Sequence, residues 1–497
     1  MTSIRIKSCR LILLVLASVV SAGSVLAAQI KVTEADWSSD DPGDHVELIE
    51  MTVSPAAQAS PIFQHRLTWL PKETVAGNAA TIYMHSLGEN LLRGKWQRLE
   101  KEFGDELYDW ARYETPRDQI PIDKLKRASA KFNSYIQQHI DRATRRRDCD
   151  WGFGLEELTG PLVIGIHLNG LQETRSISRA IALQTKLAIL ESRFEDAIDL
   201  MRKNYRLGEN VGRVQLLIGS LLAIAEVGIT NGTMVDFIAA PNSPNMYWAL
   251  TELPRPMVDM RGAFRMECGM ALRIFPEMAN AGTADHSVEE WSRIVQGIPR
   301  ATSEFYQAER TPGMVFIPTA IGIMSYAPAK KRLIESGMDA AKVEAMAVGQ
   351  VMLIDASREY RRVANMVEKE AYLPFPEFNK RSEAVEDFLR ATEGDAFDSF
   401  GKLIAAMLLP AVQQVRSAQV RTQRDIETLR IIEALRMYAA ETGKFPARLS
   451  EIKAVEIPGN PATGKPFEYR LDGEVAVLEL PRSDGIVYSK RYRISLR

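Results

Sequence analysis

The chain has 497 residues, of which 46% are hydrophobic and 25% are charged, and its formal net charge is −2 at pH 7. These proportions are those of an ordinary globular protein, and they exclude a disordered chain, a collagen-like repeat and a membrane protein with many spans. The near-balance of charge gives no electrostatic reason to expect nucleic acid as a partner. At about 100 to 200 residues per domain, the length predicts several structural units.

The first 27 residues have the pattern of a cleavable signal peptide. Basic residues precede an apolar run from Leu11 to Val20, and small residues follow this run as far as Ala28. This order is typical of secretory signals, and it predicts cleavage after Ala27. An uncleaved membrane anchor is the alternative, because the apolar run approaches the length of a span. The sequence therefore predicts export to the periplasm, the cell envelope or the medium, with membrane contact only through this segment if it is retained.

Residues 28–75 are predicted to form an extended, loosely ordered segment at the start of the mature chain. Apolar and polar residues alternate from His45 to Val53, which is typical of a strand. Residues 62–70 are a second extended candidate. The stretch at 38–44 is rich in Asp, Ser and Gly, and it predicts a loop.

Residues 76–400 are predicted to form an α-helical domain. Two charged segments without internal proline, at 91–108 and 122–142, predict amphipathic helices. Further helices are predicted over 257–275 and 340–371. The last of these ends before two prolines that would interrupt a helix.

A helical hairpin is predicted between Ile177 and Leu207. Apolar residues recur there at spacings of three and four on two successive segments, with Ser192 and Arg193 in the turn between them. This hairpin resembles a single tetratricopeptide unit, although a glycine usually stands where Ser192 is and no second copy follows at a period of about 34 residues. The apolar stretch at 216–229 is short for a membrane span and predicts a buried core helix.

Residues 401–497 are predicted to form a small α+β unit. A long helix over 413–441, stopped by Gly443 and Pro446, precedes three strand-like runs separated by Asp-Gly turns. These runs are Phe467–Leu471, Val475–Leu480 and Val487–Ser495. The predicted fold class is therefore mainly α, with an irregular body of helical hairpins and a C-terminal unit made of a long helix and about three antiparallel strands.

The segment from Ala434 to Arg470 carries a resemblance of its own. Its marker residues are Leu435, Tyr438, Gly443, Pro446, Asn460, Pro461, Gly464, Pro466 and Tyr469. Their order resembles the helix-to-sheet region of type II secretion pseudopilins, with Asn460 in place of the usual aspartate. The resemblance implies a fold for this segment and does not imply an activity or assembly into a fibre.

Five short motifs spread over most of the mature chain carry a wider resemblance. They are Ser54-Pro55-Ala56-Ala57, Gly77-Asn78-Ala79-Ala80, Asp148-Cys149-Asp150-Trp151-Gly152, Tyr247-Trp248-Ala249-Leu250 followed by Leu253-Pro254, and Gly349-Gln350-Val351. These motifs resemble a family of uncharacterised exported helical proteins of planctomycete-type bacteria. The resemblance implies location and shape only.

Two cysteines, Cys149 and Cys268, remain after removal of the signal segment. In an oxidising envelope such a pair suits a disulfide, which would contribute on the order of 4 kcal/mol for a loop of this length. Two free buried thiols are the alternative, because the sequence does not say whether the Cα atoms come within bridging distance.

Residues that could take part in catalysis or metal binding form no linear motif. The six histidines make no HExxH pattern and no His/Cys cluster, and no phosphate loop or nucleophile elbow occurs, so no cofactor or metal is expected. The run Arg145, Arg146 and Arg147 either grips an anion, as arginine forks do, or ends a helix in a structural turn. We therefore expect a noncatalytic scaffold or binding protein of the bacterial cell envelope, with an unidentified protein partner.

A hydrolase that acts on an envelope polymer or peptide is the alternative hypothesis. Such an enzyme needs titratable groups that converge on one cleft, for example Glu267 or Asp259 meeting His167 from another helix.

Overall fold

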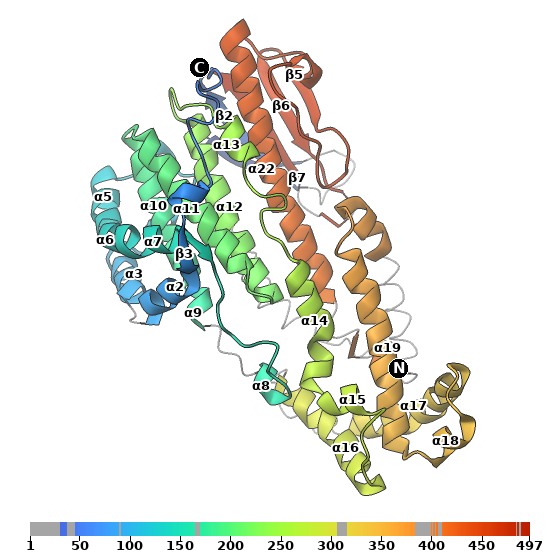
Figure 1. Ribbon diagram of the computed structural model, residues 1–497. Coiled ribbons are helices and arrows are strands. Elements are labelled where there is room, and N and C mark those ends of the chain that lie inside the picture. The colour runs from blue at the N-terminus through green and yellow to red at the C-terminus, as the bar shows by residue number, and fades with distance from the viewer. Residues whose placement is uncertain are drawn as a thin grey trace.

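The computed structural model describes residues 30–36, 45–88, 91–164, 169–305, 316–382, 399, 401–402, 404–405, 410–483, 485–486 and 489–497. The predicted signal peptide, residues 1–27, lies outside the described residues. The protein is mainly helical, with a mixed sheet at one end and a helical arm at the other (Figure 1). This agrees with the predicted class, a mainly α fold with a small C-terminal sheet.

Short helices form the first part of the helical body. They are α2 (Ala79–Gly88), α3 (Leu91–Phe103), α4 (Glu106–Asp109), α5 (Ile122–Ala130), α6 (Asn133–Tyr135), α7 (Asp141–Thr144), α8 (Pro161–Ile164) and α9 (Asn169–Gln172). The helix predicted over 91–108 is interrupted at Gly104, whose φ of +61° lies in the left-handed region that favours glycine. The helix predicted over 122–142 is divided into α5, α6, a π-helical turn and α7.

The predicted hairpin is present as α10 (Thr174–Leu190) and α11 (Phe194–Gly212), and α12 (Leu217–Ala239) packs against both. Ser192 sits in the turn with a φ of +58°, and the Arg193 N–H donates to the Ala188 carbonyl at 2.8 Å. At the close approach of α11 to α12, a Cβ on Gly208 would lie 2.9 Å from Val227. Only glycine therefore lets these two helices pack at this distance.

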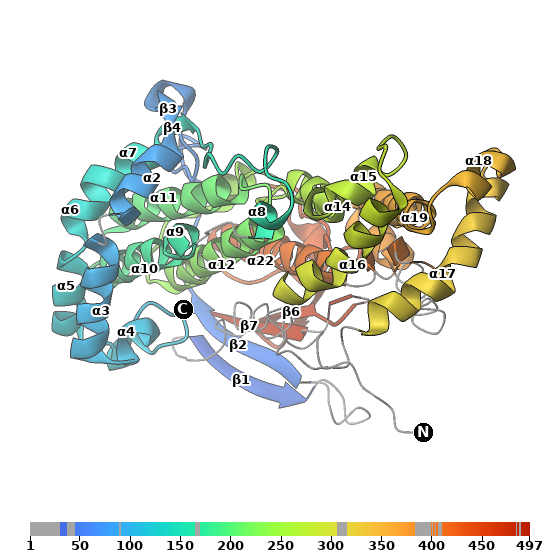
Figure 2. The ribbon, with the colours of Figure 1, turned by 90° about the horizontal axis from the view of Figure 1, so that it is seen from below.

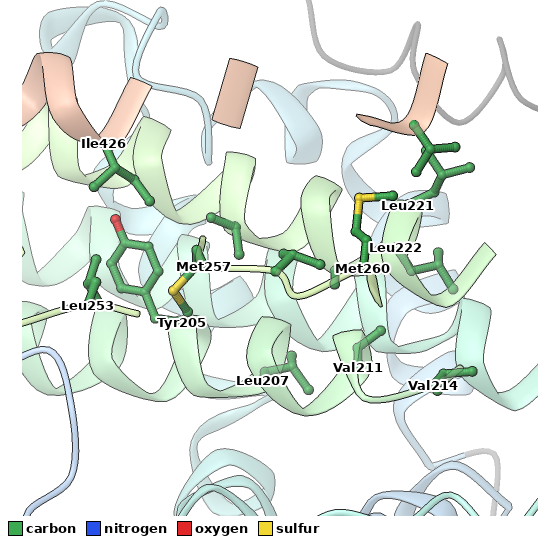
Figure 3. Packing of buried hydrophobic residues seen from close by; sticks show 14 of the residues in the cluster. Tyr205, Leu207, Val211, Val214, Leu221, Leu222, Leu253, Met257, Met260 and Ile426 are labelled. Atoms are coloured by element: carbon green, nitrogen blue, oxygen red, sulfur yellow. The ribbon is translucent and has the colours of Figure 1, made fainter. Parts of the chain in front are cut away.

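The core of the helical body lies between α11, α12 and the last long helix, α22 (Pro410–Thr442). Figure 3 shows side chains from these helices and from the 253–260 segment filling this space. The residues are almost fully buried, among them Tyr205, Leu207, Val211, Leu222, Met257 and Ile426. Apolar burial of this kind is the main source of folding free energy.

The helix α12 is the one described helix whose length and mean hydropathy match a membrane span, and 72% of its most apolar window is buried inside the molecule. It includes the apolar stretch that was predicted to be a core helix.

A helical arm extends away from the sheet (Figure 1). Its elements are α14 (Arg261–Ile274), α15 (Pro276–Asn280), α16 (Val288–Phe305), α17 (Phe316–Glu335), α18 (Ala340–Ala345) and α19 (Val348–Glu370). The short helix α13 (Tyr247–Thr251) precedes the arm and packs against α22. The helix predicted over 340–371 is thus two helices, α18 and α19. The break between them is at Met346 and Ala347, whose backbones are extended.

The main sheet combines strands from both ends of the sequence. Its order is β1-β2-β7-β6-β5, with β2 parallel to β7 and every other pair antiparallel. The strands are β1 (Ile30–Asp36), β2 (His45–Val53), β5 (Glu468–Asp472), β6 (Val475–Leu480) and β7 (Ser489–Leu496). In Figure 2 they form a layer beneath α12 and α22.

The prediction for the C-terminal strands is therefore confirmed, and β2 begins and ends where the alternation placed it. No pattern in the sequence indicated that β1 and β2 complete the same sheet. The prediction of an extended segment at 62–70 is wrong, because these residues form bends and turns. A second, two-stranded sheet pairs β3 (Val75–Asn78) with β4 (Arg146–Asp148) in parallel.

Candidate functional site

The three arginines predicted as anion-binding candidates do not face a common point. Their partners differ, being Asp141 at 2.9 Å for Arg145, the Ala76 carbonyl at 2.6 Å for Arg146 and the Thr74 hydroxyl at 3.2 Å for Arg147. The Arg145 guanidinium also lies 3.8 Å from the centre of the Trp69 ring. In this arrangement the arginines hold β4 against the segment that leads into β3.

Cys149 and Cys268 are free and buried in the structure. Burial raises the pKa of each thiol to about 12, so both are protonated and unreactive at neutral pH. Of the two alternatives for these residues, the structure has the unbridged one.

Of the residues named for a possible hydrolase, Asp259 and Glu267 have separate partners. Asp259 is half-exposed and pairs with Arg261 at 2.5 Å. Glu267 is partly buried and accepts a hydrogen bond from the Leu217 N–H at 3.3 Å, at the start of α12, and removal of its carboxyl from water raises its pKa to about 6. His167 lies outside the described residues. Across the described ranges, no group of three His, Cys, Asp or Glu side chains is placed to hold a metal ion.

Titratable side chains do converge where the sheet meets the helical body. We call this group the junction cluster. It comprises Glu47 on β2, Tyr113 and Glu114 on the 110–119 loop, Lys186 on α10, Asp236 on α12, Asp425 on α22 and Lys490 on β7. Six separate elements thus contribute to it.

The helical side of the junction cluster is a buried ion pair. The Lys186 ammonium lies 2.6 Å from the Asp236 carboxylate, and the two side chains are only 1% and 4% exposed. Lys186 also donates to the Arg112 carbonyl at 3.0 Å, and Arg117 donates to the Asp236 carbonyl at 3.0 Å. These bonds fasten both ends of the 110–119 loop to α10 and α12.

The sheet side of the junction cluster is more open. The Tyr113 hydroxyl donates to Glu47 at 3.0 Å, and Lys490 lies 3.6 Å from both Glu47 and Asp425. A Cβ on Gly232 of α12 would lie 3.1 Å from the Tyr113 ring, so the small residue there gives the ring room to reach Glu47. The pairing register sets Glu47 directly opposite Lys490 on the neighbouring strand.

Glu114 lies between these two sides and is 6% exposed. Burial raises the pKa of its carboxyl to about 7, and the charges of Glu47 and Asp236 act in the same direction. A hydrogen bond from its own backbone and the charge of Arg112 oppose them. Glu114 therefore gains or loses its proton close to neutral pH, which suits a group that transfers or senses protons.

A second unusual carboxyl lies deeper, on α12. Glu226 has no exposure to solvent, and neither of its oxygens accepts a hydrogen bond in the described structure. Burial raises its pKa to about 8, while Thr174 and Arg175 at the start of α10 oppose the shift. The Thr174 hydroxyl hydrogen is already donated to the Leu171 carbonyl at 2.6 Å. The neutral acid is therefore the form that suits this place, because it can itself donate.

Neither of two surface hollows among the described residues reaches the junction cluster. One of about 300 Å³ lies on the outer face of the sheet, between Lys31, Thr52 and Arg493. The other, of about 370 Å³, lies along α17 beside Tyr326 and Lys330. The convergent titratable groups are thus packed within the molecule and do not line either hollow.

Sequence reasoning missed the junction cluster because its members are separated by whole elements and form no local motif. One signal was available: Lys186 and Asp236 are each the one charged residue of a mostly apolar stretch, Ile181–Leu190 and Met234–Ala239 respectively. A charged residue within an apolar helical stretch needs a buried partner.

Comparison of the chain with protein-family models, with curated proteins and with solved structures finds no match.

Proposed function

We propose that the protein is an exported, noncatalytic helical scaffold or binding protein of the bacterial cell envelope, which acts through a protein partner. We propose further that it belongs with the exported helical proteins of planctomycete-type bacteria whose motifs it resembles. Export rests on the signal-like segment that precedes β1.

The proposal rests mainly on one observation: the convergent charged groups hold elements of the structure together. Lys186 and Asp236 join two helices, and Glu47 and Lys490 join two strands to the 110–119 loop and α22. Charged groups that fasten elements together produce a rigid body, and a rigid body is what a scaffold or binding protein needs.

Two local likenesses are part of the same proposal. Ser192 of the hairpin has a left-handed backbone, which accords with the glycine usual at this position of a tetratricopeptide unit. In the pseudopilin-like tail, Gly443 ends α22 with a φ of +74°, and the Tyr469 hydroxyl donates to the Pro446 carbonyl at 2.6 Å. We propose that both units provide interaction surfaces.

The experiment is crosslinking in the native envelope followed by purification through a C-terminal tag. The proposal expects the same protein partner to be captured repeatedly, with crosslinks that map to the described surface. A tagged unrelated exported domain of similar size is the control. Recovery of the protein alone and monodisperse, at the same crosslinker dose, would contradict a scaffold role.

Export has its own test, which is intact mass measurement of the protein from the native host. We expect a chain that lacks residues 1–27. A full-length chain in the cytosol would remove the envelope from the proposal.

A hydrolase acting on an envelope polymer or peptide is the second candidate, and one observation favours it. Glu114, with a pKa of about 7, lies near Glu47, and acid–base hydrolysis uses a carboxyl that gains and loses its proton near neutral pH beside a second carboxyl. The test is release of soluble fragments from purified envelope polymers. Loss of release in Glu114→Gln, with release kept in Glu267→Gln, would support the enzyme, and no release by the native protein would end it.

A further inference from the structure

A polar hollow of about 300 Å³ lies on the outer face of the main sheet, and its volume is at the lower end of the range for small-molecule sites. Successive side chains of a strand point to opposite faces of the sheet. Lys490 of β7 points to the helical side, where it lies 3.6 Å from Asp425 of α22, so Arg493, three residues further on, points outward. Figure 2 shows the sheet as a layer with α12 and α22 on one side. The hollow is formed on the side opposite to these helices.

The strand register explains the shape of the hollow. Lys31 of β1 is paired with Glu50 of β2, and Glu50 is paired with Arg493 of β7, so three long side chains form a row across the sheet. In the next row, Thr52 of β2 is paired with Ser495 of β7, and both side chains are short. The step from the long row to the short row leaves the hollow, with the long side chains as its wall and two hydroxyl groups on its floor.

Several polar groups in the hollow are available to a ligand. Within the described ranges of the chain, neither the Thr52 hydroxyl nor the Ser495 hydroxyl makes a hydrogen bond, and both side chains are partly exposed. The Glu50 carboxylate lies 3.9 Å from the Lys31 ammonium and 3.9 Å from the Arg493 guanidinium, which is beyond hydrogen-bond distance. Glu50 therefore keeps its capacity to accept hydrogen bonds, and Lys31 keeps its capacity to donate them.

The charges in and around the hollow are balanced. Lys31 and Arg493 are positive and Glu50 is negative, and Asp472 of β5 pairs with Arg493 at 3.1 Å. An anion bound here would lie beside Glu50, and a cation would lie beside Lys31. A hydroxyl group carries no charge and both donates and accepts hydrogen bonds, so neighbouring hydroxyls of one ligand can satisfy the acid and the base together.

We propose that the hollow is a binding site for an uncharged ligand with several neighbouring hydroxyl groups, which is the chemistry of a short saccharide. The ligand hydroxyls donate to Glu50, accept from Lys31, and exchange hydrogen bonds with Thr52 and Ser495. None of these side chains belongs to the junction cluster. The site therefore adds a ligand to the protein partner proposed above, and it does not depend on that partner.

The test is saturation-transfer NMR with the mature chain and a panel of uncharged trisaccharides that covers hexoses and N-acetylhexosamines in α and β linkages. We expect saturation transfer to at least one trisaccharide of the panel. Inorganic phosphate should not displace it, because the Glu50 carboxylate repels an anion. A trimer of a hexuronic acid should bind more weakly than its uncharged counterpart. Absence of transfer to the whole panel overturns the proposal, and so does stronger binding of the hexuronic acid trimer.

The two hydroxyl groups can be removed one at a time. Thr52→Val and Ser495→Ala should each weaken binding of the trisaccharide by about fivefold, the effect of one lost hydrogen bond. Thr33→Val is the matched control, because Thr33 lies on the same face of β1 as Lys31 but does not line the hollow. Thermal unfolding checks that the three variants fold as the native chain does. An equal loss of binding in Thr33→Val would contradict the assigned site.

Glu50→Gln distinguishes a saccharide site from a cationic surface. It should weaken the trisaccharide by about tenfold and strengthen phosphate, because Lys31 and Arg493 then have no acid between them. Ser495→Phe fills the hollow without a change of charge and should abolish saccharide binding. Binding that persists in Ser495→Phe overturns the proposal, and Thr52→Phe is measured in its place if Ser495→Phe does not fold. Co-sedimentation with an insoluble polymer of the bound sugar then shows whether the ligand is a polymer chain or a free oligosaccharide.

Discussion

At the scale of single residues, the surroundings of Glu226 disfavour its charged form. It lies in the apolar core between α10, α11 and α12, with no donor to either oxygen and with Arg175 opposing the shift only in part. The folded state therefore keeps a proton that the unfolded chain releases above about pH 4.5. Stability then falls as the pH rises from about 4.5 to about 8, the pKa in the folded protein.

Replacing Glu226 with Gln should remove this dependence. We expect Glu226→Gln to stabilise the protein by on the order of 2 to 3 kcal/mol at pH 7 and by much less at pH 5. Urea unfolding at both pH values measures the change. Exposed Glu277, changed to Gln, is the control and should have little effect at either pH. Equal stabilisation by Glu226→Gln at pH 5 and pH 7 would contradict this account.

The buried pair of Lys186 and Asp236 leads to a second prediction at the residue scale. Removing one partner leaves a charge that is both buried and unpaired, so Lys186→Met alone should destabilise the protein by about 3 to 5 kcal/mol. The double variant Lys186→Met with Asp236→Leu should recover much of that loss. A double-mutant cycle from chemical unfolding gives the coupling.

The surface pair of Lys126 and Glu191 serves as the comparison for this cycle. Its atoms are 2.8 Å apart, but the side chains are 50% and 29% exposed, so we expect coupling below about 1 kcal/mol. If both cycles gave the same coupling energy, burial would not be what makes the pair of Lys186 and Asp236 important.

At the scale of elements, the α10–α11 turn contains a residue in a conformation that its side chain disfavours. Ser192 has a φ of +58°, a region that costs most L-residues about 1 kcal/mol relative to glycine. We expect Ser192→Gly to raise the free energy of unfolding by up to about 1 kcal/mol. The converse change, Gly443→Ala, at a φ of +74° after α22, should lower it by a similar amount. Thermal unfolding of the two variants checks both signs, and a loss of stability in Ser192→Gly would contradict the first.

Elements with a local signal could be predicted from the sequence. The spacing of apolar residues placed α10 and α11, and alternation between turn residues placed β2 and the strands near the C-terminus. The break between α18 and α19 was missed, because neither Met346 nor Ala347 is a proline or a glycine that would indicate the extended backbone there. The prediction for the 62–70 segment was wrong for a related reason. The half-buried Trp69 contacts the guanidinium groups of Arg145 and Arg202, at 3.8 and 4.7 Å from its ring centre, and such contacts depend on the tertiary structure.

At the scale of the whole molecule, Arg436 on α22 joins three distant parts of the chain. It is fully buried, pairs with Glu433 at 2.9 Å, and donates to the Ser54 carbonyl at 2.8 Å and the Ser243 carbonyl at 2.7 Å. A planar guanidinium can donate hydrogen bonds to all three partners at once, whereas a lysine ammonium cannot.

We therefore expect Arg436→Lys to lower stability by at least about 2 kcal/mol and to make the segment after β2 more sensitive to proteolysis. Thermal unfolding and mass spectrometry of limited digests measure the two effects. Arg448→Lys is the control, because Arg448 is 81% exposed. Cleavage that increases equally in both variants would contradict a joining role for Arg436.

The candidate site could not be predicted from the sequence, because it depends on how whole elements meet. Glu47 and Lys490 become neighbours only through the parallel pairing of β2 with β7, and Glu114 lies beside them only because the 110–119 loop crosses the junction. A single sequence contains no local pattern for contacts of this range.

The same pairing of β2 with β7 sets an order of events during synthesis. The β1–β2 pair emerges first, and the edge of β2 stays open until the last strand arrives. Open strand edges recruit other chains. A product that stops before Ser489 keeps that edge bare. Chaperones and proteases thus have a physical means to distinguish unfinished copies from finished ones.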